Sequence, residues 1–224
     1  MTTASGTSTQ VADLVARARH EIAEQDTGNR FVDLLEAGAV PAERLRVLAA
    51  ELHLLVACDQ RSQALLASRF PAAPAGELFR ALAQGEAEAL RLLADFAAAV
   101  GVDAADLPAY EPLPLARAYP AYLAQVAAFG SSSAMALALL ANVDESGGTY
   151  ARVAAALRSR YGLADDAVGH FVFFAETPRE LLDQAAAVAA AGLAAGESAA
   201  EAVRTARIVA ALETVFWDTL AEGI

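Results

Sequence analysis

Residues 210–220 near the end of the chain read AALETVFWDTL and place one carboxylate inside an apolar helical stripe. On a helix, the residues that share a face with Glu213 are Val209, Phe216, Trp217 and Leu220. An ionised glutamate there is costly unless it is paired or hydrogen-bonded, or unless its pKa is raised. A carboxyl held in this way suits general acid–base catalysis. The alternative is a structural glutamate that is bonded to a neighbouring helix or lies at the rim of the bundle.

The rest of the chain shows helical spacing, and no segment alternates like a half-buried strand. The expected helices cover residues 11–25, 30–36, 41–70, 76–100, 120–129, 134–157, 165–176, 178–194 and 198–221. Glycine and proline clusters separate them, and the longest irregular stretch is 102–114, which holds three prolines. We expect one all-α domain over 11–224, preceded by a polar, disordered tail at 1–10.

Composition narrows the possible partners and the compartment. The net charge of −12 argues against a basic face for nucleic acid and against an anionic membrane surface. No apolar run reaches the roughly 18 residues that suggest a membrane span. A single cysteine excludes an internal disulfide and fits a reducing compartment. We therefore expect a cytoplasmic protein with neither a nucleic-acid nor a membrane partner.

Four segments occur in an order that resembles the TenA family. They are 31-FVDLLEAG-38, the long helix ending 58-CDQRS-62, 118-AYPAYL-123, and the Glu213 segment, where Phe-Trp-Asp begins three residues after the glutamate. The resemblance runs from about Val11 to the C-terminus and implies the single-domain, haem-oxygenase-like helical bundle that TenA shares with PqqC. It further implies a thiaminase II-type hydrolase, which acts on thiamin or on aminopyrimidines derived from it. A homodimer or homotetramer without a cofactor is also implied.

The resemblance assigns candidate site residues, but this sequence lacks the nucleophilic cysteine of the family. Glu213 and Tyr119 match the family glutamate and tyrosine, and the family spacing from Tyr119 puts Asn142 where TenA proteins have a cysteine. An amide cannot attack as a thiolate does, so thiaminase activity should be absent or very weak. Near the expected place of the family aspartate stand Glu51 and His53, which become candidate ligand-binding residues.

Other residues could supply the chemistry or the walls of a pocket. Cys58 is the only thiol, but a buried helical cysteine is usually packing, and the acid beside it would raise its pKa. Glu145 lies one turn after Asn142 and could pair with Glu213 to activate a water. The segment 144–148 equally fits a solvated break in the helix. Phe171, Phe174 and Trp217, together with Tyr119, could line a pocket for a flat ring or simply fill the core.

The sequence gives little support for the di-iron and haem sites that other proteins of the same fold contain. His170 has Phe174 at i+4, which departs from a di-iron motif, and no metal site is expected. His20 lies in an Arg-His-Glu context comparable to a haem ligand, but no basic surround accompanies it. Two function classes remain: a TenA-like hydrolase of a small heterocycle that uses Glu213, and a non-catalytic small-molecule-binding protein. An iron- or haem-dependent oxidase is a weaker third.

Overall fold

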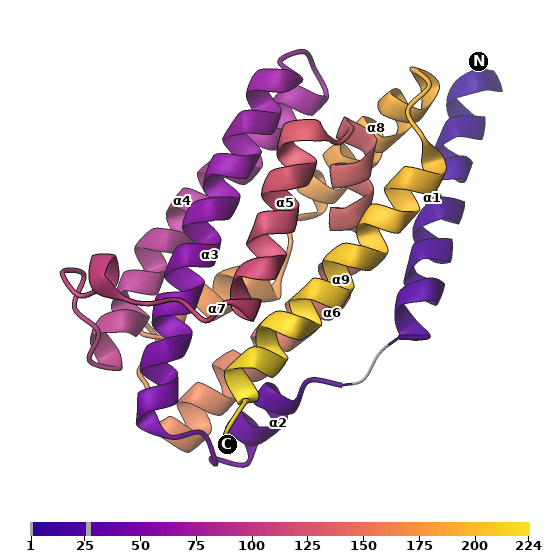
Figure 1. The fold of residues 1–224 in the computed structure, drawn as a ribbon. Helices are drawn as coiled ribbons and strands as arrows, with labels where there is room; N and C mark the ends of the chain where they lie inside the picture. Colours follow the sequence, from indigo (N-terminus) through magenta and orange to yellow (C-terminus); the bar gives the residue numbers. More distant parts are fainter. Residues whose placement is uncertain (1, 26–27) are drawn as a thin grey trace.

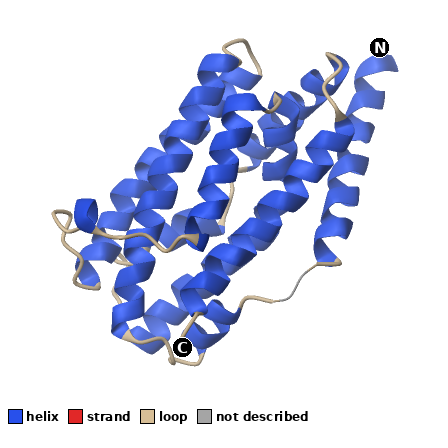
Figure 2. Cartoon of the chain, viewed as in Figure 1, coloured by secondary structure: helices blue, strands red, loops and turns tan. Residues whose placement is uncertain are grey.

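Helices form all the regular structure in the described part of the chain, residues 2–25 and 28–224, with residues 2–8 described by backbone alone (Figures 1 and 2). The structure is a computed structural model. Its α-helices are α1 (Thr2–Ala23), α2 (Arg30–Glu36), α3 (Ala42–Arg69), α4 (Ala75–Ala99), α5 (Ala118–Phe129), α6 (Ser132–Tyr161), α7 (Gly169–Ala175), α8 (Arg179–Ala194) and α9 (Ala199–Ala221). Two short 3₁₀ turns, η1 (Leu107–Ala109) and η2 (Leu115–Arg117), lie in the proline-containing connection.

The all-α prediction is confirmed, with two local differences. Residues 2–10 belong to α1, where the sequence predicts a disordered tail, and Met1 lies outside the described residues. This part of the chain contains no proline, so it can extend the amphipathic helix that carries the buried Val11. The second difference is that α6 runs unbroken through residues 144–148.

The glycine at position 147 is explained by packing between α6 and α7, and not by a break in α6. A Cβ at this position would lie 2.9 Å from the carbonyl oxygen of Ala175, at the end of α7. The glycine therefore lets the backbone of α7 approach α6 closely, and it serves packing rather than a turn. The close approach also brings Phe174 toward the middle of α6.

The two long helices α6 and α9 run side by side through the molecule, with α1 beside α9 and the α3–α4 pair on the opposite side of α5 (Figure 1). One apolar core includes Phe31, Leu48, Phe96, Phe171 and Trp217, and a second includes Leu66, Phe79, Leu137, Ala189 and Val203. Tyr119 packs against both cores. Tyr119 on α5 therefore lies where the two cores meet.

Both ends of α6 are held, which sets the position of the residues in its middle. At the start, the Glu197 carboxylate accepts a hydrogen bond from the backbone N–H of Ser133 at 2.7 Å. At the end, Gly162 adopts a left-handed conformation with φ of 67°, as is common after a helix C-terminus. Among the described helices, none is long and apolar enough to cross a membrane.

Candidate functional site

A cavity of about 170 Å³, here called the inner cavity, lies between the two cores. Its polar lining comes from five helices and the α7–α8 connection and consists of Asp59, Gln63, Glu86, Tyr119, Asn142, Ser146, Tyr150, Thr177 and Glu213. Phe174, Phe216 and Trp217 supply aromatic walls. Tyr119, Asn142 and Glu213 thus lie in one cavity, although they come from α5, α6 and α9.

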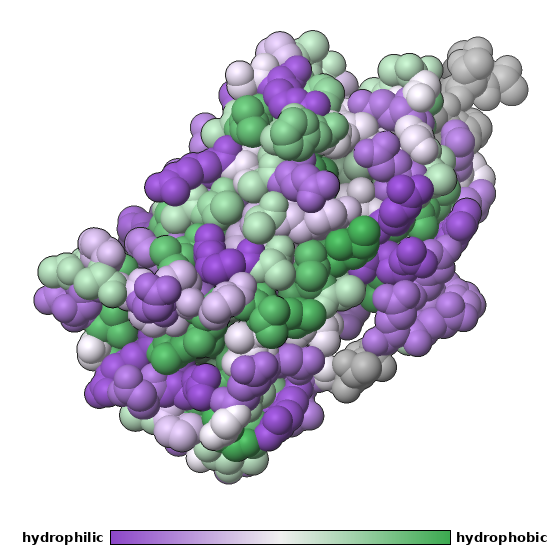
Figure 3. Space-filling model, in the orientation of Figure 1, coloured by the Kyte–Doolittle hydropathy of each residue, from purple (hydrophilic) through white to green (hydrophobic). Residues whose placement is uncertain are grey.

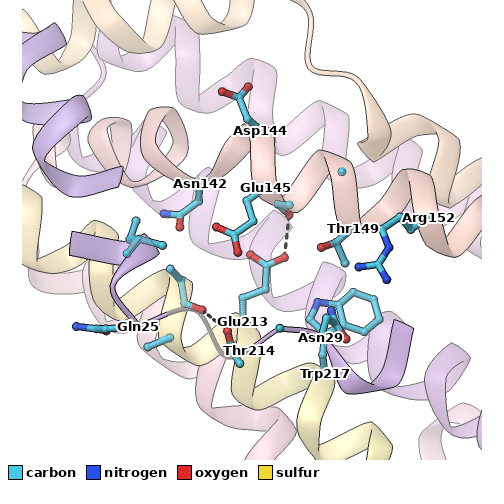
Figure 4. Close-up of a pocket in the computed structure, with 16 residues that line it drawn as sticks. Gln25, Asn29, Asn142, Asp144, Glu145, Thr149, Arg152, Glu213, Thr214 and Trp217 are labelled. Carbon is cyan, nitrogen blue, oxygen red and sulfur yellow. Dashed lines mark hydrogen bonds between the residues drawn. The ribbon is translucent and has the colours of Figure 1, made fainter. Parts of the chain in front are cut away.

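A second cavity, here called the outer chamber, adjoins the inner cavity on the side of α1 and α2 (Figure 4). Both cavities are lined by Asn142, Ser146, Glu213 and Trp217, which therefore form the wall between them. Glu145 also lines the outer chamber, and Figure 4 shows its side chain pointing toward Glu213 while Asp144 points away. Glu145 is exposed and α6 is continuous here, so the structure shows neither a break in the helix nor a buried pair of carboxylates.

Glu213 is partly buried, and the accessible part of its surface faces the two cavities. The Ser146 hydroxyl donates a hydrogen bond to its Oε1 at 2.8 Å (Figure 4). Burial raises the pKa of Glu213, while hydrogen bonds from Ser146 and Trp217 oppose the shift and the charge of Glu145 adds to it. The sequence-based expectation of a shielded carboxyl with a raised pKa therefore agrees with the structure.

Asn142 links the two long helices through its amide. Its Nδ2 donates to the carbonyl oxygen of Ala138 at 2.8 Å and to that of Ala206, on α9, at 3.1 Å. The side chain is buried and still lines both cavities. Asn142 thus fastens α6 to α9 at the wall of the site, and its nitrogen is engaged by main-chain acceptors.

Glu51 and His53 lie outside both cavities, so the structure does not place these two predicted ligand-binding residues in the site. Glu51 is fully buried, and its Oε1 accepts hydrogen bonds from the Tyr110 hydroxyl at 2.7 Å and the Leu113 N–H at 2.6 Å. Through these two hydrogen bonds, Glu51 holds the 102–114 connection against α3. His53 lies in a shallow hollow between α3, α4 and the same connection, where burial lowers its pKa.

Asp59, and not Glu51, is the acidic residue of α3 that lines the inner cavity. It lies eight residues further along α3, and Gln63, one turn later, lines the same cavity. The 28 residues of α3 contain no glycine or proline, so the sequence offers no marker of axial position along this helix. Nothing in the sequence singles out Asp59 and Gln63, because the three residues between them, Gln60, Arg61 and Ser62, are polar as well.

The aromatic predictions divide between the cavity and the core. Phe174 and Trp217 line the inner cavity. Phe171 does not: it is fully buried and packs edge-on against Phe96 with a centroid separation of 5.0 Å. Tyr150, which the sequence analysis does not single out, lines the cavity. Its ring packs against that of Phe174 with a centroid separation of 5.1 Å.

Glu86 on α4 is a further cavity residue that sequence reasoning misses. Its neighbours Gly85, Ala87 and Glu88 make the segment resemble a solvated helix face. Burial instead raises the pKa of Glu86 to about 8, and burial together with Glu86 raises the pKa of Asp59. Oδ1 of Asp59 and Oε1 of Gln63 are buried without a hydrogen-bond donor. This end of the cavity is therefore rich in acceptors.

The remaining titratable side chains lie apart from the cavity. Cys58 is directed at the carbonyl oxygen of Pro120, 3.6 Å away, and burial raises its pKa, as expected for a packing cysteine. His170 is buried with Nδ1 3.0 Å from the carbonyl oxygen of Ala89, and its pKa is lowered to about 4. His20 is exposed beside Glu24. Within residues 2–25 and 28–224, no group of three or more potential ligands is arranged to hold a metal ion.

The half-buried Glu86 should make the stability of the protein depend on pH. Between its ordinary pKa of 4.5 and its raised pKa of about 8, the folded chain holds a proton that the unfolded chain releases. The free energy of unfolding should therefore fall as the pH rises through this interval. We expect Glu86→Gln to reduce the slope of this fall, because an amide does not ionise.

Urea denaturation at several pH values between about 5 and about 8 measures this slope. The exposed neighbour provides the control, since Glu88→Gln should keep the wild-type dependence. An unchanged slope in the Glu86→Gln protein would show that another group governs the pH dependence.

Comparison with known proteins agrees with the architecture. Residues 20–222 match the model of the TENA/THI-4/PQQC family. No match was found among curated proteins. A domain of unknown function with a heme oxygenase-like fold from Shewanella denitrificans is 18% identical, with a TM-score of 0.68 over 96% of this chain and 91% of that chain.

Two TenA structures give similar values. A TenA homologue from P. horikoshii is 18% identical, with a TM-score of 0.68 over 96% of this chain and 99% of that chain. A TenA family transcription regulator from a Silicibacter species is 19% identical, with a TM-score of 0.65 over 97% and 96%. These identities establish the fold alone, whereas the family match covers nearly the whole chain. The chain therefore belongs to the TENA/THI-4/PQQC family and has the heme oxygenase-like fold of its TenA homologues.

Proposed function

We propose that the inner cavity binds a small heterocycle related to thiamin or to an aminopyrimidine, and that Glu213 is the acid–base group in the hydrolysis of a C–N bond. One observation carries this proposal. Tyr119, Asn142 and Glu213, which the family resemblance selects from three helices, line a single cavity with aromatic walls. The only cysteine of the chain does not line that cavity.

The size and lining of the inner cavity favour a single substituted ring. Its volume of about 170 Å³ is below the roughly 300–1,000 Å³ of pockets for drug-sized ligands. Trp217 and Phe174 offer apolar faces to a flat molecule, while Asp59 and Gln63 offer buried acceptors to its donor groups. This combination of a few polar groups with aromatic walls supports a small aromatic ligand.

Glu213 has the environment that acid–base chemistry requires. Its raised pKa makes the carboxylate a stronger base than an exposed glutamate, and it can return the proton to the departing nitrogen. The Tyr119 and Tyr150 hydroxyls remain neutral, since burial raises the pKa of both well above the ordinary value. They can therefore donate hydrogen bonds to negative charge that develops on the ligand.

A second candidate is a binding protein that retains the pocket without turnover. The observation that favours it is the bonding of Asn142, whose amide nitrogen is engaged by two carbonyl oxygens at the position of the family nucleophile. Both candidates share the same ligand class and differ only in whether Glu213 acts on it.

For either candidate we propose a cytoplasmic homodimer or homotetramer without a nucleic-acid or membrane partner. The acidic charge of −12 supports the absence of a nucleic-acid partner. Phe129, the last residue of α5, is 84% exposed, and Leu115, in η2 just before α5, is 56% exposed. Figure 3 shows apolar side chains gathered across this face of the molecule, which supports contact with another copy of the chain.

Replacing Glu213 with glutamine should abolish turnover while preserving the fold and ligand binding, because the amide keeps the shape and loses the proton. Ammonia release from an aminomethyl-substituted aminopyrimidine measures turnover, and thermal shift with the same compound measures binding. Glu88→Gln is the matched control, since this exposed carboxylate lines neither cavity and its replacement should leave activity unchanged. Wild-type rates in the Glu213→Gln protein would contradict the role of Glu213.

Replacing Asn142 with cysteine should introduce cleavage of thiamin, which the unmodified protein should perform very weakly or not at all. The thiol would be placed at the wall shared by the two cavities, within the same chamber as Glu213. Loss of thiamin in a chromatographic assay measures the gain. Efficient cleavage of thiamin by the unmodified protein would show that Asn142 does not stand at the position of the nucleophile.

A further inference from the structure

We infer that the Ser146 hydroxyl is a catalytic nucleophile of this protein, with Glu213 as its base, in place of the missing thiol. The inference rests on the proposed function, since it concerns the same cavity and the same hydrolysis. Neither the sequence pattern nor the family resemblance points to Ser146. The observation that points to Ser146 is its hydrogen bond from α6 to Glu213 on α9.

The bonding of Ser146 differs from that of several other serines and threonines in the interior of the described helices. Ser132, at the start of α6, also donates to a carboxylate, that of Glu197 at 3.0 Å, but it lines neither cavity. Ser62, Ser159 and Thr219 each donate to the carbonyl oxygen four residues earlier, the usual local bond of a hydroxyl inside a helix. Ser146 instead donates across to the Glu213 carboxylate at 2.8 Å. Its proton is therefore directed at a base on another helix.

The position of Ser146 matches that of a group that must reach a bound ligand. Of the four residues that line both cavities, it carries the only hydroxyl. It lies one turn after Asn142 on α6, so it occupies the same helix face as the position of the family thiol. Thr214, by comparison, lines the outer chamber alone and donates to the carbonyl oxygen of Ala210.

The surroundings supply the other parts of a nucleophilic site. A nucleophile needs a base within hydrogen-bond reach and a third group that orients the base. Trp217, one turn after Glu213 on α9, is buried and lines both cavities with it, so its indole restricts the positions of the carboxylate. Tyr119 and Tyr150 line the inner cavity beside the reacting atoms and can donate to developing negative charge.

The chemistry balances without a further reactant besides water. Oγ of Ser146 forms a bond to the ligand carbon that bears the leaving nitrogen, and Glu213 takes the hydroxyl proton. The C–N bond breaks, and Glu213 passes this proton to the departing amine. Water then attacks the same carbon with Glu213 as base, the C–O bond to Ser146 breaks, and Ser146 regains its proton. The net result is one water consumed, one amine released and one hydroxylated product.

Phenylmethanesulfonyl fluoride, a small aromatic sulfonyl fluoride, tests whether Ser146 is activated. Its S–F bond breaks as the serine oxygen forms an S–O bond, and fluoride leaves with the serine proton. Intact-mass spectrometry followed by peptide mapping should find one adduct, at Ser146. The adduct should be absent from Ser146→Ala and form at least about tenfold more slowly in Glu213→Gln, because loss of the base removes a factor of roughly 10²–10⁴ in proton transfer. Ser159→Ala, which changes an exposed serine of the same helix, should label as the wild type does.

Ser146→Ala assayed for ammonia release from the aminomethyl-substituted aminopyrimidine separates a nucleophile from a residue that only positions Glu213. We expect a loss of at least about a hundredfold in kcat with binding retained in thermal shift. An unlabelled wild-type protein, or a Ser146→Ala protein that keeps turnover within about threefold, would overturn the inference while leaving the proposed function intact. If the wild type neither binds nor hydrolyses the compound, the proposed function fails, and sulfonylation still decides whether Ser146 is activated.

Discussion

The burial of the Glu213 carboxyl where α6 and α9 pack together is the constraint on which the rest of the site depends. Two side-chain bonds connect these helices at that point, from Asn142 to the carbonyl oxygen of Ala206 and from Ser146 to Glu213. The donors lie one turn apart on α6, so together they fix the register of the two helices. A shift of either helix would leave a buried carbonyl or carboxylate without its donor, which is costly.

The inner cavity carries three carboxyls and no cationic side chain among its lining residues. In a site of low dielectric, ionising several carboxyls costs free energy, and the carboxyls avoid part of this cost by keeping their protons. The raised pKa values of Glu86 and Asp59 are consistent with this. A core built for stability alone would place apolar side chains there. Retaining these carboxyls, together with the unpartnered acceptors of Asp59 and Gln63, is consistent with a cavity whose polar groups are completed by a ligand.

Sequence reasoning succeeds here where local signals mark a position and fails where they do not. Glycine and proline limit most helices, so their order could be predicted. The spacing after Tyr119 leads to Asn142 and the Phe-Trp-Asp segment leads to Glu213, and both residues line one cavity. The long, uninterrupted α3 gives no axial marker, and Asp59 is missed. Gly147 indicates a break in sequence but provides a close contact in the structure. Ser146 is ordinary in sequence, because its bond to Glu213 joins residues 67 positions apart.

A crystal structure of the protein with an aminopyrimidine bound tests the central claim most directly. The account predicts the ring in the inner cavity, against Trp217 and Phe174, with a polar group within hydrogen-bond distance of Glu213 and its amino group directed at Asp59. Binding elsewhere, for example in the hollow beside His53, would contradict it. So would an inner cavity closed by its own side chains at saturating ligand.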